Sequence, residues 1–466
     1  MVVLDSFKYS LSFDLKPSKL FSMETTPDLR RSWYVLVVLM LAYISSFIDR
    51  QVLALLIEPI KRDFHVSDSQ VGLLYGLSFA IFYTFLGIPI GKLADTKNRK
   101  KIIVVGITVW SLMTAICGVT NSFWQLFLAR MGVGVGEASL SPAAYSLITD
   151  MFPKNKLGTA MGIYNVGVFL GSGLSIFLVA LIIKLVSVEG MWDLPIVGLI
   201  HPWQTVFFMV GLPGLLIVAL IWFTVQEPER LTAKVEAVPN AEVINYFKAN
   251  RTVILSIYFG IAFMAFATYG ATAWSVSSLI RNYGLKQAEA GVIFGLIVTV
   301  FSTGGVITGG RFADSLTKKG LLNGRLTVSF RAMMLSSVIG LCLVVLIATT
   351  SVPPMPVLLC LIAAFCFASS LPYAAAVAAL QEVVPATMRG VFSALFLFVV
   401  NLIGIGLGPL AVGIINDTFF KTPQTILISM AISILFASII SSTILSQGLA
   451  KFSQSVDNAK NAIIAQ

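Results

Sequence analysis

Four ionisable residues stand inside two long apolar stretches of this 466-residue chain, where charged side chains are rare. Asp49 and Arg50 are adjacent in the first stretch, and Arg130 and Glu137 lie seven residues apart in a later one. If these stretches cross a membrane, each charge near the bilayer centre costs about 2.5–3.5 kcal/mol on insertion scales. Because that cost is tolerated where such groups face a cavity or one another, these four residues are the first candidates for chemistry.

The spacing of the four residues indicates that they share a level in the membrane. A helical rise of 1.5 Å per residue puts Asp49 ~12 Å and Arg130 ~10 Å below the same membrane edge. Glu137 follows two helical turns deeper on the same face as Arg130. We predict that Asp49 pairs with Arg130 when deprotonated, and that Asp49 and Glu137 carry protons. Arg50 is expected to face a cavity and attract an anionic head group; the alternative is that all four merely lock two helices together.

The second half of the chain offers a different kind of surface, because its apolar stretches carry almost no charge. Aromatic residues accompanied by hydroxyl groups stand there instead. We predict that Tyr269, Trp274 and Tyr373 bind the apolar part of a substrate whose head meets Arg50 and Glu137. For each aromatic residue alone, ordinary packing is the alternative, so the prediction depends on the asymmetry between the halves.

A short charged pattern occurs twice in the chain. Gly91-Lys92-Leu93-Ala94-Asp95 recurs as Gly310-Arg311-Phe312-Ala313-Asp314, with basic residues after both copies. Lys92, Asp95, Arg99 and Asp314 are predicted to form a cytoplasmic charge latch between the two halves of the chain in an outward-open state. The usual excess of basic residues in cytoplasmic loops explains the lysines but not the two matching aspartates.

The composition identifies the chain as an integral membrane protein. Hydrophobic residues make up 57% and charged residues 12% of it, against about 25% charged in soluble domains, and the mean hydropathy is +0.89. Continuous apolar runs long enough to cross a bilayer as helices predict an all-α protein with twelve transmembrane helices in two six-helix halves. The runs are 33–57, 69–91, 102–120, 123–150, 158–186, 203–225, 251–280, 288–310, 326–350, 354–384, 389–416 and 423–446.

Lysine and arginine gather in alternate loops, which predicts that both termini are cytoplasmic. The expected domains are a cytoplasmic tail (1–32), an N-terminal half (33–225), a cytoplasmic linker (226–250), a C-terminal half (251–446) and a second cytoplasmic tail (447–466).

Other function classes are disfavoured. The net charge of +10 is spread over short loops rather than gathered for nucleic acid. The four cysteines lie in apolar runs without zinc-type spacing, so neither a metal nor a disulfide is expected. No nucleophile–base set and no nucleotide-binding lysine motif appears, so we expect no enzyme activity and no cofactor, and an ion gradient as the energy source.

The pattern Gly91-x-x-x-Asp95-x-x-x-Arg99-Lys100 resembles the inner-loop signature of the major facilitator superfamily. Ile48-Asp49-Arg50, together with the run from Arg130 to Pro142, is similar to the Spinster-like branch. The resemblance implies the major facilitator fold, with the first and fourth helices lining a central cavity. It also implies a bacterial inner-membrane protein related to carriers of lysophospholipids and sphingoid lipids, for which proton coupling is proposed.

The expected function is therefore proton-coupled transport of a lipid-like amphiphile by alternating access. The expected partners are this substrate, protons and membrane lipid, and the protein is expected to be a monomer. One alternative is a proton symporter for a small organic anion, in which Arg50 and Arg130 hold a carboxylate. Another is a non-transporting receptor, which the paired latch motifs and buried carboxylates disfavour.

Overall fold

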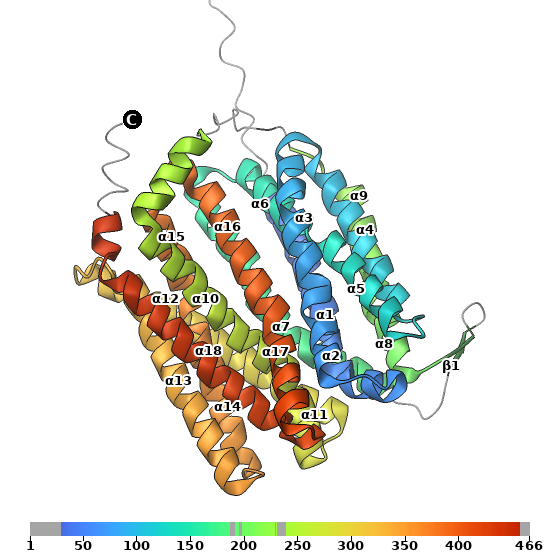
Figure 1. Ribbon diagram of the computed structural model, residues 1–466. Coiled ribbons are helices and arrows are strands. Elements are labelled where there is room, and N and C mark those ends of the chain that lie inside the picture. The colour runs from blue at the N-terminus through green and yellow to red at the C-terminus, as the bar shows by residue number, and fades with distance from the viewer. Residues whose placement is uncertain (1–28, 187–191, 195–197, 229, 231–238, 457–466) are drawn as a thin grey trace, which may run out of the picture.

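The computed structural model of the chain describes residues 29–186, 192–194, 198–228, 230 and 239–456 (Figure 1). Most of the expected tails, 1–32 and 447–466, lies outside the described residues. The helix after the expected linker begins at Asn240, so the last part of 226–250 is helical.

The N-terminal half contains nine helices and one small hairpin within its described residues. In chain order these are α1 (Leu29–Phe64), α2 (Asp68–Tyr75), α3 (Leu77–Thr96), α4 (Arg99–Cys117), α5 (Phe123–Glu137), α6 (Leu140–Met151), α7 (Lys154–Val186), the antiparallel strands β1 (Trp192–Leu194) and β2 (Gly198–Ile200), α8 (Pro202–Gly211) and α9 (Pro213–Thr224).

The described residues of the C-terminal half form helices joined by short turns and loops, without a strand. It contains α10 (Asn240–Tyr283), α11 (Gln287–Ile297), η1 (Val298–Ser302), α12 (Thr303–Lys318), α13 (Gly324–Thr350), α14 (Met355–Ser370), α15 (Pro372–Val383), η2 (Ala386–Met388), α16 (Arg389–Val400), η3 (Asn401–Leu407), α17 (Gly408–Ile415), η4 (Asn416–Phe420), η5 (Pro423–Thr425) and α18 (Ile426–Leu449). Of the η segments, η1, η3 and η4 are π-helical.

The prediction of an all-α protein built from long apolar helices is confirmed. Ten helical stretches among the described residues are long and apolar enough to cross a membrane. The two remaining expected spans, 123–150 and 158–186, correspond to the broken helix α5–α6 and to α7. Each of the twelve apolar runs therefore overlaps at least one helix among the described residues, in the predicted order.

Several spans are broken near their middle for identifiable local reasons. The second span breaks at Gly76, between α2 and α3, where a Cβ atom would lie 2.4 Å from the carbonyl oxygen of Gly406. Pro213 and Pro372 begin new helical segments, because proline lacks the N–H that continues a helix but fits its first turn. These breaks let one span present two differently oriented surfaces to its neighbours.

The two halves meet most closely at one end of the molecule. We call the face at which α1 begins the inner face and the opposite one the outer face. At the outer face, α2 packs against α17 (Figure 1), and one apolar cluster includes Leu53 of α1 and Trp274 of α10. Toward the inner face the halves have largely separate apolar clusters. The structure is therefore closed at the outer face.

A glycine contact sets the position of α5, which carries two of the four membrane charges. A Cβ atom added at Gly136 would lie 2.5 Å from the backbone nitrogen of Trp110 and 2.7 Å from the carbonyl oxygen of Gly106, both on α4. Because those atoms belong to backbone, they cannot move aside as a side chain can. Close approach of α4 and α5 therefore requires glycine at position 136.

Replacing Gly136 by alanine should destabilise the protein by about 1–3 kcal/mol, the usual cost of overpacking. Thermal unfolding in detergent is the measurement. Gly162→Ala on α7 is the matched control, since a Cβ at Gly162 meets nothing within 4 Å and alanine favours a helix by roughly 1 kcal/mol over glycine. Equal melting temperatures for the two variants would contradict the close contact.

Candidate functional site

The four membrane charges come together from α1 and α5. Asp49, Arg130 and Glu137 are each 1% exposed, and the side chain of Arg50 is 14% exposed. Arg50 Nε lies 2.5 Å from Glu137 Oε2, which makes a buried ion pair between the two helices. Ser122 caps the start of α5 by accepting a hydrogen bond from the backbone of Gln125, which fixes where the helix begins.

The expected ion pair between Asp49 and Arg130 does not form in the structure. Arg130 Nη1 instead donates to the backbone carbonyl oxygen of Asp49, at 2.8 Å. Neither carboxylate oxygen of Asp49 has a hydrogen-bond partner of normal geometry among the described residues. The carboxylate has Thr114 and Cys117 of α4 as neighbours, so it lies inside the N-terminal half.

Arg50 occupies a more enclosed position than the sequence suggests. Its guanidinium carbon lies 5.0, 4.8 and 4.7 Å from the ring centres of Phe47, Phe79 and Tyr83. Cation–π contacts of this kind hold a guanidinium in place while leaving its edge available for hydrogen bonds. Arg50 therefore does not point freely into a cavity, because aromatic rings and Glu137 surround most of it.

Part of the Arg50 side chain nevertheless borders a small pocket between the two halves. Arg50, Gln51 and Arg130 line this pocket from the N-terminal half, and Tyr269 and Ile405 line it from the C-terminal half. Arg130 Nε has no hydrogen-bond partner among the described residues. Two arginines at one pocket give it a positive wall that suits an anion.

A larger cavity adjoins this pocket and extends into the C-terminal half. It contains no charged side chain among its lining residues. Tyr269 and Tyr373 line it as expected, together with hydroxyl groups of Thr268, Thr272 and Ser370. The hydroxyls of Thr268 and Thr272 already donate to carbonyls of α10, which leaves an uncharged and weakly polar surface.

Trp274 differs from the prediction, since it does not line the cavity. Its side chain is fully buried, and its indole nitrogen donates to the carbonyl oxygen of Pro409 at 2.9 Å. A buried tryptophan normally finds such a partner for its N–H group. Trp274 therefore packs α10 against α17 at the outer end of the molecule.

The residues of the expected inner latch are not brought together. Lys92 and Asp95 are exposed. Asp314 is 68% exposed and 4.0 Å from Arg325 of its own half, which also pairs with Glu382. This arrangement fits a structure that is closed at the outer face, because a latch at the inner face is expected only in the opposite state.

Arg99 is not a surface residue, contrary to its expected place. Its side chain is fully buried, where it pairs with Asp150 and lies 2.8 Å from Glu227. It also donates to the carbonyl oxygens of Ser146 and Pro228, so its planar group of donors is well satisfied. Arg99 thus ties α4, α6 and the start of the linker together within one half.

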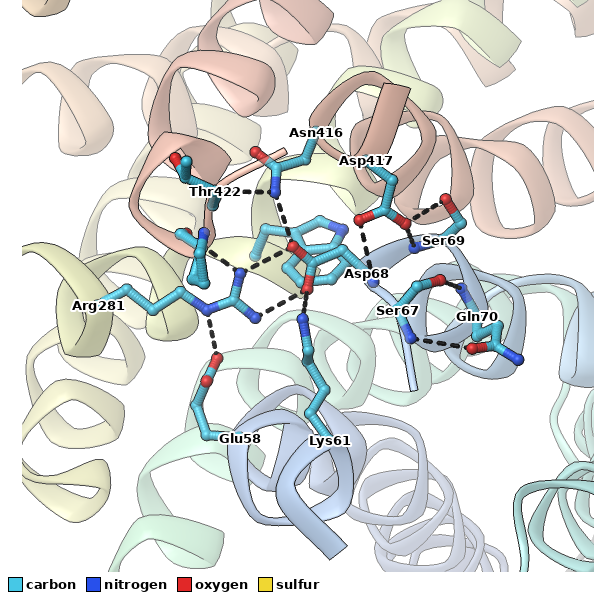
Figure 2. Close-up of polar contacts among 12 residues, drawn as sticks. Glu58, Lys61, Ser67, Asp68, Ser69, Gln70, Arg281, Asn416, Asp417 and Thr422 are labelled. Atoms are coloured by element: carbon cyan, nitrogen blue, oxygen red, sulfur yellow. Dashed lines mark hydrogen bonds and ion pairs between the residues drawn. The ribbon is translucent and has the colours of Figure 1, made fainter. Parts of the chain in front are cut away.

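A second charged cluster, absent from the sequence analysis, lies at the outer face (Figure 2). Arg281 of α10 reaches across to Glu58 of α1 and Asp68 of α2. Asp68 begins α2 and Arg281 lies in the last turn of α10, beside loops where charged side chains are ordinary. Their spacing in the sequence therefore gave no signal that they meet.

Comparison with known proteins gives a consistent result. Residues 39–409 match the Major Facilitator Superfamily. The chain is 32% identical over 425 residues to protein spinster homolog 1 of Xenopus laevis, covering 85% of this chain and 76% of that protein. It is also 27% identical over 398 residues to the hexuronate transporter of Bacillus subtilis (strain 168), covering 82% and 87% of the two chains.

Among solved structures, the chain resembles the crystal structure of a bacterial homologue of the human lysosomal transporter Spinster in an inward-facing and unoccupied conformation. The TM-score is 0.71 at 26% identity, and the match covers 92% of this chain and 98% of that one. Sequence match, curated relatives and fold agree with one another. The chain therefore belongs to the major facilitator superfamily, in its Spinster-like branch, and is a multi-pass membrane transporter rather than an enzyme.

Proposed function

We propose that this transporter moves an amphiphile with an anionic head group across a bacterial inner membrane, driven by protons. The observation that carries the proposal is the asymmetry of the central space. Arg50 and Arg130 border it on the N-terminal side, whereas the adjoining cavity on the C-terminal side has no charged lining residue. An anionic head beside the arginines and an apolar tail in the uncharged cavity would match both surfaces.

The ion pair between Arg50 and Glu137 offers a way to couple a proton to an anion. Breaking a buried pair by removing one partner typically costs about 3–5 kcal/mol, because a charge is left uncompensated. Protonation of Glu137 would leave the charge of Arg50 uncompensated. An anionic head group would then take the place of the Glu137 carboxylate as the counter-charge of Arg50. Proton and anion would thus favour each other's binding, as linkage requires.

Asp49 is the second proposed proton carrier. An ionised carboxylate that is buried without a hydrogen-bond donor costs free energy, and a proton removes that cost. Arg130 is held by the backbone carbonyl of Asp49 rather than by its carboxylate. Proton exchange at Asp49 would therefore change the charge beside Arg130 without first breaking an ion pair.

The uncharged cavity supports an amphiphile over a compact polar substrate. Tyr373 belongs to α15, and Leu343 and Ile434 lie on α13 and α18, so several helices of the C-terminal half line the cavity. The cavity therefore reaches into the interior of the C-terminal half. A small polar anion held at the two arginines would leave this apolar extension unused.

A proton symporter for a small organic anion is the second candidate. The likeness to a hexuronate transporter favours it, and two arginines at one small pocket suit a carboxylate. In this case the head-group pocket alone would form the substrate site. The two candidates therefore differ in whether the cavity of the C-terminal half binds substrate.

The remaining features of the proposal concern topology. We place both termini in the cytoplasm and regard the monomer as the working unit, with the halves at 33–225 and 251–446 joined by the linker 226–250. Lys92, Asp95 and Asp314 stay as the predicted inner latch of the outward-open state. Their exposure at a face that the halves do not close is compatible with that role.

Replacing Glu137 by glutamine should make binding of a lysophospholipid almost independent of pH, because the variant mimics the protonated acid. Arg50→Gln should abolish binding at every pH, since the head group loses its charge partner. Ligand-induced thermal stabilisation at acidic and neutral pH measures both effects. A Glu137→Gln protein that keeps the pH dependence of the parent protein would refute the linkage.

Asp49→Asn should abolish accumulation driven by a proton gradient in proteoliposomes while preserving exchange of labelled for unlabelled substrate. Exchange needs alternating access but no net proton movement, so it serves as the control for folding. Glu137→Gln is expected to behave in the same way. Undiminished gradient-driven uptake by both variants would remove these carboxylates from the coupling mechanism.

Cys366→Phe should distinguish the two candidate substrates, because Cys366 lines the cavity of the C-terminal half. The larger ring should abolish stabilisation by lysophospholipids and leave any binding of small organic acids intact. Cys360→Phe is the matched control, since Cys360 is exposed on the same helix. If Cys366→Phe bound lysophospholipids normally, the tail would not occupy this cavity.

A further inference from the structure

Arg281 joins the two halves at the outer face through contacts with Glu58 and Asp68 (Figure 2). Its Nε lies 2.8 Å from Glu58 Oε1, and Nη1 and Nη2 each lie 2.9 Å from one carboxylate oxygen of Asp68. The side chains of Arg281 and Asp68 are 4% and 2% exposed. A two-pronged contact of this kind fixes orientation as well as distance.

Asp68 collects further donors from both halves. Lys61 of α1 donates to Oδ1, and Asn416 Nδ2 of η4 lies 2.8 Å from Oδ2. Each carboxylate oxygen therefore accepts from Arg281 and from one further donor. The further donor is Lys61 at Oδ1 and Asn416 at Oδ2. Asp68 is the common acceptor that joins α1, α2, α10 and η4.

Asp417 makes a second contact across the halves by binding the first turn of α2. One of its oxygens accepts from the backbone nitrogen of Ser69 at 2.7 Å and from the Ser69 hydroxyl at 2.6 Å. The other accepts from the backbone nitrogen of Asp68 at 3.3 Å. The first N–H groups of a helix have no partner inside it, so a side chain of the C-terminal half completes this helix end.

Glycines allow the backbones of the two halves to touch along α2. A Cβ added at Gly72 would lie 2.6 Å from the carbonyl oxygen of Pro409, and one added at Gly76 would collide with the backbone of Gly406. Gly413 approaches the backbone of Asp68 as closely. The contact between α2 and the C-terminal half is therefore tight enough to exclude water and substrate.

Pro59 accounts for one more contact between the halves, the hydrogen bond from Gln287 to Leu55. Pro59 lies inside α1 and has no N–H group, so the carbonyl of Leu55, four residues earlier, lacks its usual helical partner. Gln287 of α11 donates its side-chain amide to that carbonyl. A buried carbonyl without a partner is costly, so Gln287 can satisfy Leu55 only while the outer ends are together.

We propose that these contacts form the outer gate of the transporter, with Asp68 as its centre and Gln287 as an independent fastening on Leu55. The gate holds the state that is open to the inner face, and its contacts separate when the outer side opens. These contacts close the outer side whatever the identity of the substrate.

The test measures the gate directly by pulsed electron spin distance measurements. In a protein whose four native cysteines are replaced, spin labels at positions Asn121 and Val352 report the outer separation of the halves, and labels at Lys101 and Lys319 report the inner one. Asp68→Asn should lengthen the outer distance and shorten the inner one. Unchanged distances in a folded Asp68→Asn protein would overturn the assignment of Asp68.

Asp63→Asn is the matched control. Asp63 is an acid at the same end of α1, but its partners Arg62, His201 and Trp203 all belong to the N-terminal half. Its removal should therefore leave both distances as they are in the parent protein. An equal shift in Asp63→Asn would show a general loss of outer structure, which also contradicts a gate centred on Asp68.

A second pair of variants tests Gln287 without touching the charges. Gln287→Leu leaves the Leu55 carbonyl without a donor in the closed state, so the outer distance should lengthen. Adding Pro59→Ala supplies a helical N–H to that carbonyl and should restore the shorter distance. Failure of Gln287→Leu to shift the distances, or of Pro59→Ala to restore them, would refute the proline-dependent fastening. Because the readout is distance rather than transport, it is unaffected if the proposed substrate or proton coupling is wrong.

Discussion

The buried ion pair between Arg50 and Glu137 is the interaction on which the central site depends. It joins α1 to α5 where neither residue has much access to water. A pair of charges in such surroundings is stable only while both partners are present and hydrogen-bonded. If one partner loses its charge, the other needs a new counter-charge. In a transporter, a proton can neutralise Glu137 and a negatively charged substrate can pair with Arg50.

The residues around this ion pair hold Arg50 in place and leave the larger cavity without a charged side chain. The aromatic rings of Phe47, Phe79 and Tyr83 hold the guanidinium of Arg50, so its charge stays in place when its partner changes. The C-terminal half contributes shape and apolar surface but no competing charge at the larger cavity. In the proposed function, charge recognition and tail binding are divided between the two halves, and a substrate that contacts both surfaces would bridge them.

The sequence predicted the fold well because long apolar runs admit few structures in a bilayer. It also singled out Asp49, Arg50, Arg130 and Glu137, since charges are conspicuous in such runs. It could not predict the pairing: rise per residue fixes depth, whereas adjacent residues on a helix point about 100° apart. Arg50 therefore faces Glu137 while the carboxylate of Asp49 faces α4. Burial of Arg99 and the meeting of Asp68 with Arg281 depend on segments far apart in sequence, which no local pattern records.

Helix α1 connects the central charges to the outer closure. Arg50 and Glu58 lie eight residues apart on it, about 12 Å along the axis. Beyond Arg50 toward the outer end of α1 lie Leu55, Glu58 and Lys61, each of which takes part in the contacts that close the outer face. In the proposed mechanism, a change in the partner of Arg50 would act on a helix whose far end is fastened to the other half. Pro59 lies within this same stretch and removes one internal hydrogen bond, so the outer end of α1 is held partly by the opposite half and not by the helix alone.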